Sequence, residues 1–171
     1  NRILSKMPKN KFIVGYAGSI GLANALDTFI EAAKNLKHNK EIAFVLVGDG
    51  HLRQNLISKV AKYKLKNVTF IDLVPKKGIP QVLKKFDICY IGWKKSPLYQ
   101  YGIAANKIFD YMVASKPILH AYSGGGDPIK KYNCGIVVEP ENDLILAEKI
   151  LFLSKLEKNK LNEMGMNGKL A

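Results

Sequence analysis

A regular alternation of short apolar runs with segments of helical periodicity constrains this chain more than any other feature. Strands that are buried on both faces read as continuous apolar runs. Six runs of this kind follow one another: Phe12–Ala17, Ala43–Val47, Val68–Val74, Ile88–Gly92, Ile118–Ala121 and Gly135–Val138. Segments with helix spacing separate them, as in Leu26, Phe29, Ile30 and Ala33. The pattern predicts an α/β fold, a doubly wound, Rossmann-like parallel sheet of about six strands with right-handed crossovers.

The length of the chain, 171 residues, fits one domain or one lobe of a larger enzyme. Because residue 1 is Asn and not Met, we expect residues 1–10 to be the linker from a missing N-terminal lobe. Residues 11–171 are then a single Rossmann-like domain. The polar stretch from Lys158 to Ala171 is expected to form at most a helical turn. No apolar run approaches the roughly 20 residues that span a membrane.

The charge is strongly basic, with 27 Lys+Arg against 14 Asp+Glu and a net charge of +13. Such a balance suggests nucleic acid, anionic lipid or phosphorylated substrates as partners. Only Arg2 and Arg53 are arginines, and the lysines are spread over many segments. Sequence-specific nucleic-acid binding relies on arginine forks, so we do not expect nucleic acid as a partner. A solvated lysine-rich surface and a basic face against anionic lipid remain as alternatives.

The cysteines and histidines give no sign of a metal site. Cys89 and Cys134 both lie in apolar stretches, where cysteine behaves as a small hydrophobe, and two cysteines make no disulfide framework. His38, His51 and His120 do not cluster in the sequence. We therefore predict no metal, and the cytoplasm as the compartment.

Ligands of open α/β sheets bind at the carboxyl ends of the strands, so the loops there are the first candidates for a site. The first of these loops contains Gly18, Ser19 and Gly21 and leads to a helix that Asn24 could cap. Small residues let backbone amides approach a phosphate at a helix N-terminus. The chemistry of a tight turn explains the same glycines equally well.

A second candidate is the helix that opens at Ala105, Asn106 and Lys107. Its first amides and the lysine are suited to a diphosphate. Asp110 follows Asn106 by one turn on the same helix face. A carboxylate beside phosphates is unfavourable unless it accepts hydrogen bonds from hydroxyls, and a ribose has two. By itself, Asp110 also fits a solvated helix acid.

Four segments, taken together, point to a family: Ile13–Asp27, Val45–Leu52, Asn67–Pro75 and Asn106–Ile118. In their order and intervals they resemble the C-terminal donor-binding lobe of GT-B glycosyltransferases of the retaining family 4. The stretch from Tyr101 to Met112 is similar to a bacterial surface-polysaccharide subgroup that includes N-acetylfucosaminyl transferases. The resemblance covers nearly the whole chain.

This resemblance implies the donor-binding half of a glycosyltransferase. Such an enzyme transfers a hexosyl or N-acetylhexosaminyl group from a nucleotide-sugar, which we expect to be UDP-linked. The acceptor is a glycan or a lipid-linked glycan, held through the missing lobe at the inner face of the plasma membrane. No metal or other cofactor is implied. The catalytic residues are expected in the missing lobe, so this piece is expected to be inactive alone.

The family pattern also implies roles for single residues. Its two glutamates, separated by seven residues, fall on Gly102 and Asp110. Asp110 is then the ribose ligand, whereas Gly102, beside Tyr101 at the donor-sugar cleft, has no side chain to hold the sugar. The family's diphosphate-clamping arginine and lysine fall on the uncharged Ser19 and Asn24. We expect Lys107 to supply the missing positive charge.

The nucleoside end of the implied site consists of Gly48, Asp49 and Val74. Asp49, in a Gly-Asp-Gly turn, is equally suited to being a turn residue. Trp93 and Tyr99 are candidates for the sugar cleft or for plain packing of their loop. Two other functions remain open, a lobe similar to a UDP-sugar epimerase and a basic, non-catalytic nucleic-acid-binding module.

Overall fold

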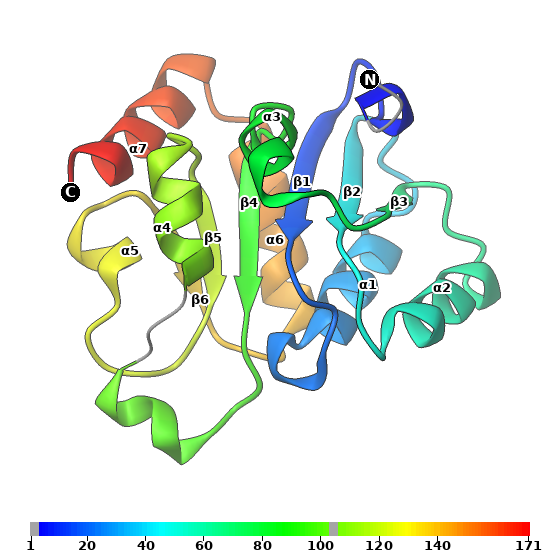
Figure 1. Ribbon diagram of the computed structural model, residues 1–171, viewed down its shortest axis with the longest axis horizontal. Coiled ribbons are helices and arrows are strands. Elements are labelled where there is room, and N and C mark those ends of the chain that lie inside the picture. Colours follow the sequence, from blue (N-terminus) through cyan, green and yellow to red (C-terminus); the bar gives the residue numbers. More distant parts are fainter. Residues whose placement is uncertain (1–3, 103–105) are drawn as a thin grey trace.

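A single six-stranded parallel sheet forms the centre of the molecule, with strand order β3-β2-β1-β4-β5-β6 (Figure 1). The computed structural model describes residues 4–102 and 106–171. The strands are β1 Phe12–Ala17, β2 Ile42–Val47, β3 Val68–Ile71, β4 Ile88–Gly92, β5 Ile118–Ala121 and β6 Gly135–Val138. The predicted fold class, a doubly wound parallel sheet, is confirmed.

Helices cover both faces of the sheet, which explains the continuous apolar runs of its strands. The helices α1 (Leu26–Asn35), α2 (Arg53–Lys62) and α6 (Asp143–Ser154) pack on one face. The other face is covered by α3 (Ile79–Leu83), α4 (Asn106–Val113) and α5 (Pro128–Lys131). In β1, Val14 and Tyr16 belong to the first core layer, whereas Ile13 and Ala17 belong to the second. This period of two divides each strand between the two layers.

The C-terminal stretch differs from the sequence expectation. Residues Lys158–Leu170 form a full helix, α7, which lies along α4 (Figure 1). Its glycines make the close approach feasible: a Cβ on Gly165 would overlap the backbone of Ser115, and Gly168 lies against Met112 and Cys134. The expected single turn was wrong because these glycines, weak helix formers in isolation, are needed for packing.

Short 3-10 helices in the described residues lie before β1 and in the loops: η1 Leu4–Lys6, η2 Leu22–Asn24, η3 Lys76–Gly78 and η4 Pro97–Tyr101. Near the N-terminus, Met7 is buried against the sheet, so part of segment 1–10 packs on the domain. The linker role of that segment stays a prediction. Strand β3 ends at Ile71, short of the predicted Val74, because the chain turns there toward η3.

The sheet reverses its winding between β1 and β4, which are adjacent although β2 and β3 lie between them in the sequence. Connections from these two strands leave in opposite directions, so a crevice opens at their carboxyl ends. This switch point lies toward the bottom of Figure 1, where the loops after β1 and β4 begin. None of the described helices is both long and apolar enough to cross a bilayer.

Candidate functional site at the carboxyl edge of the sheet

The turn after β1 is held against the turn after β2. The amide of Gly18 donates to the carbonyl of Val47 (2.9 Å), and that of Ile20 donates to the carbonyl of Asp49 (2.9 Å). Gly48 has φ +141°, and a Cβ there would overlap the carbonyl oxygen of Gly18. The two predicted elements, Gly18–Gly21 and the Gly48 turn, therefore form one surface at the switch point.

Lys107 lies over this surface. A Cβ on Gly18 would overlap its side-chain carbon Cε, so the absence of a side chain at Gly18 makes room for the lysine. The ammonium Nζ donates to Oδ1 of Asn24 (3.3 Å) and lies 5.5 Å from the ring centre of Tyr16. Lys107 thus lies beside Asn24 and the Gly18 turn, and its supply of charge to a diphosphate stays a prediction.

The charge of Lys107 is poorly compensated. Burial lowers the pKa of its ammonium below the usual lysine value, because desolvation disfavours the charged form. Among the residues that the structure describes, no carboxylate lies within ion-pair distance of Nζ. A bound anion would supply the missing counter-charge.

Asn24 does not cap α1, and that prediction was wrong. Ala25, with φ +45°, takes the N-cap position and makes no side-chain cap. The buried amide of Asn24 instead donates to the carbonyl of Ser19 (3.0 Å) and accepts from Lys107. A buried amide is most stable with both its donor and its acceptor paired, and the loop offers both partners. Asn24 therefore holds the lysine and the loop together.

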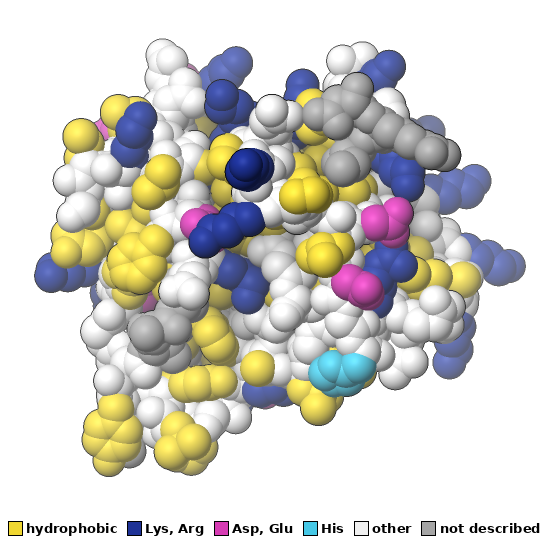
Figure 2. Space-filling view, in the orientation of Figure 1, with side chains coloured by type: hydrophobic (Ala, Val, Ile, Leu, Met, Phe, Trp, Pro, Cys, Tyr) yellow, Lys and Arg dark blue, Asp and Glu magenta, His cyan; other side chains and the backbone are white. Residues whose placement is uncertain are grey.

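Asp110 lies on the exposed side of α4, one turn after Asn106. It lines a groove of about 510 Å³ between α3 and α4, together with Lys76, Ile79 and Phe109. Figure 2 shows this face, on which acidic and basic side chains lie next to each other beside α4. Within the described part of the chain, no hydrogen bond or ion pair occupies the Asp110 carboxylate. It is therefore free to accept hydrogen bonds from a ligand, although its side chain does not join Lys107 at the glycine turn.

The nucleoside candidates have different surroundings. Oδ1 of Asp49 accepts from the amide of Gly50 (2.8 Å), which is the behaviour of a turn residue. Val74 is buried, packs on Gly78 and lines a separate hollow of about 400 Å³ with Leu4 and Lys77. Its side chain is thus part of the core, and only its backbone could meet a base.

The sugar-cleft candidates lie at the end of η4. Tyr101 is 85% exposed, and Gly102 has φ +94°. A Cβ on Gly102 would lie 3.8 Å from the carbonyl oxygen of Gly125, so this position faces the glycine loop after β5. Ala105 lies outside the described residues, and Asn106 begins α4 with an exposed side chain.

Two residues at this edge of the sheet, Tyr16 and His120, were not identified from the sequence. Tyr16, whose hydroxyl donates to the carbonyl of Ser19, forms the floor below Lys107. His120 is fully buried between Trp93 and Asp127. An ionisable residue inside the apolar run Ile118–Ala121 was the signal that could have revealed it. No group of three or more His, Cys, Asp or Glu residues in the described ranges is arranged to hold a metal ion.

The fold and its switch-point turn define the class of this chain, a doubly wound α/β domain with a ligand site at the carboxyl edge of its sheet. The family of glycosyl transferases group 1 matches residues 2–171. The chain belongs to this family.

Known proteins similar to this chain are consistent with that assignment. WcaI of Escherichia coli (strain K12), named as a colanic acid biosynthesis glycosyl transferase, is 33% identical over 85 residues, which are 50% of this chain and 20% of that protein. The C-terminal domain of the glycosyl transferase group 1 protein LpcC of Francisella tularensis has a TM-score of 0.77 at 22% identity, covering 99% of this chain and 89% of its own. HepE of Anabaena, solved with UDP-glucose, has a TM-score of 0.74 at 18% identity, covering 94% and 43%.

The two structural similarities establish a common fold. The aligned half of this chain covers about a fifth of WcaI, and this chain covers less than half of the HepE chain.

Proposed function

We propose that this chain is the donor-binding half of a glycosyltransferase that moves a sugar from a UDP-sugar to a glycan or lipid-linked acceptor in surface-polysaccharide synthesis. The observation that carries the proposal is the partly buried ammonium of Lys107, held by Asn24 over the Gly18 turn at the switch point. Membership of the glycosyl transferases group 1 supports it. The complex of the similarly folded HepE with UDP-glucose supports the choice of donor.

In this proposal the diphosphate lies against Lys107 and the backbone of Gly18, Ser19 and Gly21. The leaving nucleoside diphosphate gains negative charge when the glycosidic bond to it breaks, so a cation in a partly desolvated site stabilises that charge more than it would in water. Lysine and backbone amides can perform this task without a metal, and none is proposed.

The remaining contacts in this proposal are those that the family pattern implies. Asp110 accepts hydrogen bonds from the ribose hydroxyls, and the Asp49 turn and the backbone at Val74 border the base. Tyr101 and Gly102 border the sugar, and Ala105 and Asn106 border the diphosphate.

The wider setting is also part of the proposal. The acceptor and the catalytic residues belong to a second lobe, connected through residues 1–10, so this chain alone binds donor and does not turn it over. The enzyme works in the cytoplasm at the inner face of the plasma membrane, where its basic surface meets anionic lipid. The transferred group is an N-acetylhexosamine of the N-acetylfucosaminyl type or a related hexose.

Nucleotide selectivity tests the proposal. A pocket bordered by turn backbone and an acid for the ribose is expected to accept UDP more readily than the bulkier ADP or GDP. Isothermal titration calorimetry of the chain with UDP, ADP and GDP measures this directly. ADP binding as tight as UDP binding would contradict the assignment of a UDP donor, and binding of mixed RNA at moderate salt without UDP binding would favour a nucleic-acid module instead.

A further inference from the structure

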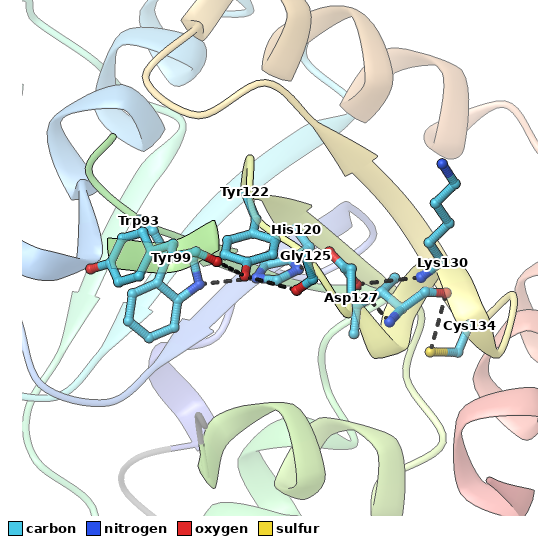
Figure 3. Close-up of polar contacts among 9 residues, drawn as sticks. Trp93, Tyr99, His120, Tyr122, Gly125, Asp127, Lys130 and Cys134 are labelled. Carbon is cyan, nitrogen blue, oxygen red and sulfur yellow. Dashed lines mark hydrogen bonds and ion pairs between the residues drawn. The ribbon is translucent and has the colours of Figure 1, made fainter. Parts of the chain in front are cut away.

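His120 connects two segments that are remote from each other in the sequence. It lies on β5 and is fully buried. Its Nε2 lies 2.9 Å from the indole Nε1 of Trp93, and its Nδ1 lies 2.8 Å from a carboxylate oxygen of Asp127 (Figure 3). Trp93 directly follows β4, and Asp127 is the N-cap of α5. We call these three residues the His120 relay.

The hydrogen bonds of the relay fix where the imidazole proton resides. An indole N–H can only donate, so Nε2 of His120 must accept and carries no proton. The proton then lies on Nδ1 and is donated to Asp127. Burial by itself would raise the pKa of Asp127, but hydrogen bonds from His120 and from the amides of Ile129 and Lys130 lower it overall. The relay is therefore a neutral imidazole between an indole and a carboxylate.

This arrangement excludes one role for His120. Although a histidine next to an aspartate resembles a catalytic pair, a general base needs a lone pair within reach of the substrate. The lone pair on Nε2 of His120 already accepts the hydrogen bond from Trp93, and the ring is fully buried. His120 thus acts through its neighbours.

The neighbours of the relay form an aromatic cluster beside the sugar end of the cleft. Tyr122 stacks on His120, with ring centres 4.9 Å apart, and Tyr99 lies edge-on to Trp93 at 5.5 Å. The Tyr122 hydroxyl lies 2.8 Å from the carbonyl oxygen of Tyr99 and 3.1 Å from that of Gly125, and it can donate to either. Figure 3 shows these rings in a row from Trp93 to His120.

The glycine loop after β5 is locked into the same cluster. A Cβ on Gly124 would overlap both the Tyr122 hydroxyl and the carbonyl of Tyr99. The next glycine, Gly125, faces Gly102. At Gly102 the family pattern has a glutamate, so this chain has no carboxylate there to hold the sugar. Trp93 and Tyr99 are only half-buried, so part of each ring stays open to a ligand.

We propose that His120 is a positioning residue for the donor sugar, which it serves by holding the Trp93 indole and the Ser123–Gly126 loop in the orientation that receives the sugar ring. The inference rests on the proposed function, the binding of a UDP-sugar at this edge. The ligand is a pyranose whose C–H face packs on the indole of Trp93. The aromatic ring provides the apolar contact to the sugar that Gly102, without a side chain, cannot provide.

The tautomer of His120 is tested in the unmodified chain. Nitrogen-15 NMR of the imidazole rings should show the His120 proton on Nδ1, with the exposed His38 and His51 as internal references. A proton on Nε2 would mean that Trp93 is not bound to His120, and that would overturn the relay.

The role of the relay is tested by fluorescence, because Trp93 is the single tryptophan of the chain. The titrants are UDP, UDP-glucose, UDP-galactose and UDP-N-acetylglucosamine. We expect UDP to change the emission little, and at least one UDP-sugar to shift it and to bind about three- to tenfold more tightly than UDP. If UDP binds but no UDP-sugar alters the emission, this inference fails while the proposed function stands. If UDP does not bind, the proposed function fails first.

Two variants separate the two halves of the relay. In His120→Asn, the amide nitrogen takes the place of Nδ1, so the Asp127 bond is kept and the Trp93 bond is lost. In His120→Gln, the amide oxygen can reach the place of Nε2 and keep the Trp93 bond. We expect UDP affinity to stay within about twofold in both. The UDP-sugar preference should vanish in His120→Asn and be partly rescued in His120→Gln.

His38→Asn, in an exposed turn, is the matched control and should behave as the unmodified chain. An unchanged sugar preference in a folded His120→Asn variant would overturn the proposal. If circular dichroism shows that His120→Asn does not fold, Trp93→Phe takes its place. This variant keeps the packing and removes only the indole donor and part of the ring, and calorimetry then measures whether the sugar preference is lost.

Discussion

At the scale of single residues, the candidate site depends on one lysine that has no carboxylate partner among the described residues. Nζ of Lys107 donates to a neutral amide, that of Asn24, and lies over the ring of Tyr16. Neutral partners orient the ammonium without cancelling its charge, so its attraction for an anion is kept. Asp110, one turn further along α4, has the opposite charge and lines a separate groove. The two residues are therefore expected to affect different parts of a nucleotide.

The first prediction separates these two contributions. Lys107→Ala should weaken UDP by about tenfold and leave uridine nearly unchanged, because only UDP carries phosphates. Asp110→Asn should weaken UDP and uridine alike, since both carry the ribose, and a lost charged hydrogen bond costs about 1.5–3 kcal/mol. Calorimetry with both ligands measures this. Lys130→Ala, on an exposed turn of α5, is the control. If all four titrations equal those of the unmodified chain, neither Lys107 nor Asp110 contacts the nucleotide.

The second prediction uses the pKa of Lys107. Because burial lowers this pKa, the ammonium loses its proton at a lower pH than an ordinary lysine, whose pKa is about 10.4. UDP binding should thus weaken as the pH rises toward that value. Arginine stays protonated throughout this range, so Lys107→Arg should keep its affinity. Both proteins are titrated with UDP over the same pH range, so that ionisation of UDP itself affects both affinities equally. If the two affinities fall in parallel as the pH rises, the prediction is contradicted.

At the scale of elements, the site exists because two strand-terminal turns contact each other. Gly18 and Gly48 follow β1 and β2, which are paired over their whole length from Phe12 to Ala17. A Cβ on Gly48 would overlap the carbonyl of Gly18, a Cβ on Gly18 would overlap the side chain of Lys107, and both glycines have positive φ. The parallel pairing of β1 with β2 thus sets the distance between the Gly18 turn and the Asp49 turn.

The third prediction concerns this contact. Gly48→Ala combines an unfavourable φ with an overlap against the Gly18 carbonyl, so we expect a loss of stability of about 2–4 kcal/mol. If Gly48→Ala still folds, its UDP binding should be weaker than that of the unmodified chain. Gly126→Ala is the matched control, because its φ is +66° and no atom lies within 4 Å of the added Cβ. Chemical denaturation of both variants gives the comparison. Equal losses would show that only φ matters and that the contact between the turns does not.

At the scale of the whole molecule, the net charge of +13 is distributed unevenly. Five lysines line a groove of about 420 Å³ at the amino edge of the sheet, opposite the switch point: Lys6, Lys11, Lys37, Lys40 and Lys66. No acidic residue is part of the lining as far as the structure describes it. Convergent like charges raise the local potential, so this edge is the strongest candidate for contact with anionic lipid.

The fourth prediction tests that surface. The chain should bind vesicles that contain phosphatidylglycerol and should dissociate as the salt concentration rises, with each contacting lysine contributing about 1 kcal/mol. The triple change Lys37→Glu, Lys40→Glu and Lys66→Glu should abolish binding. The control is a triple change on α7 that alters the net charge equally: Lys158→Glu, Lys160→Glu and Lys169→Glu. Co-sedimentation measures the binding. Equal losses in both triple variants, or equal binding to neutral vesicles, would contradict a specific lipid-facing edge.

The sheet was predictable because its information is local. Strands buried on both faces need continuous apolar runs, and four of the six observed strands have the predicted bounds, for example Ile88–Gly92 and Gly135–Val138. The edge of the sheet for the candidate site could be chosen from the same pattern, since a doubly wound sheet directs its ligand loops to the carboxyl ends of its strands. Helix α7 was not, because its glycines acquire their role only against α4.

The sequence by itself thus determined the fold class, and it predicted the edge of the sheet for the candidate site and the residue types available there. The tertiary structure alone decided which of them meet. Lys107 and Asn24 are 83 residues apart, and whether the lysine reaches the Gly18 turn depends on how α4 packs on the sheet. His120 sits in an apolar strand, and its partners come from two other segments. Such pairings depend on distances that sequence spacing does not contain, because they are fixed only when both core layers have closed around the sheet.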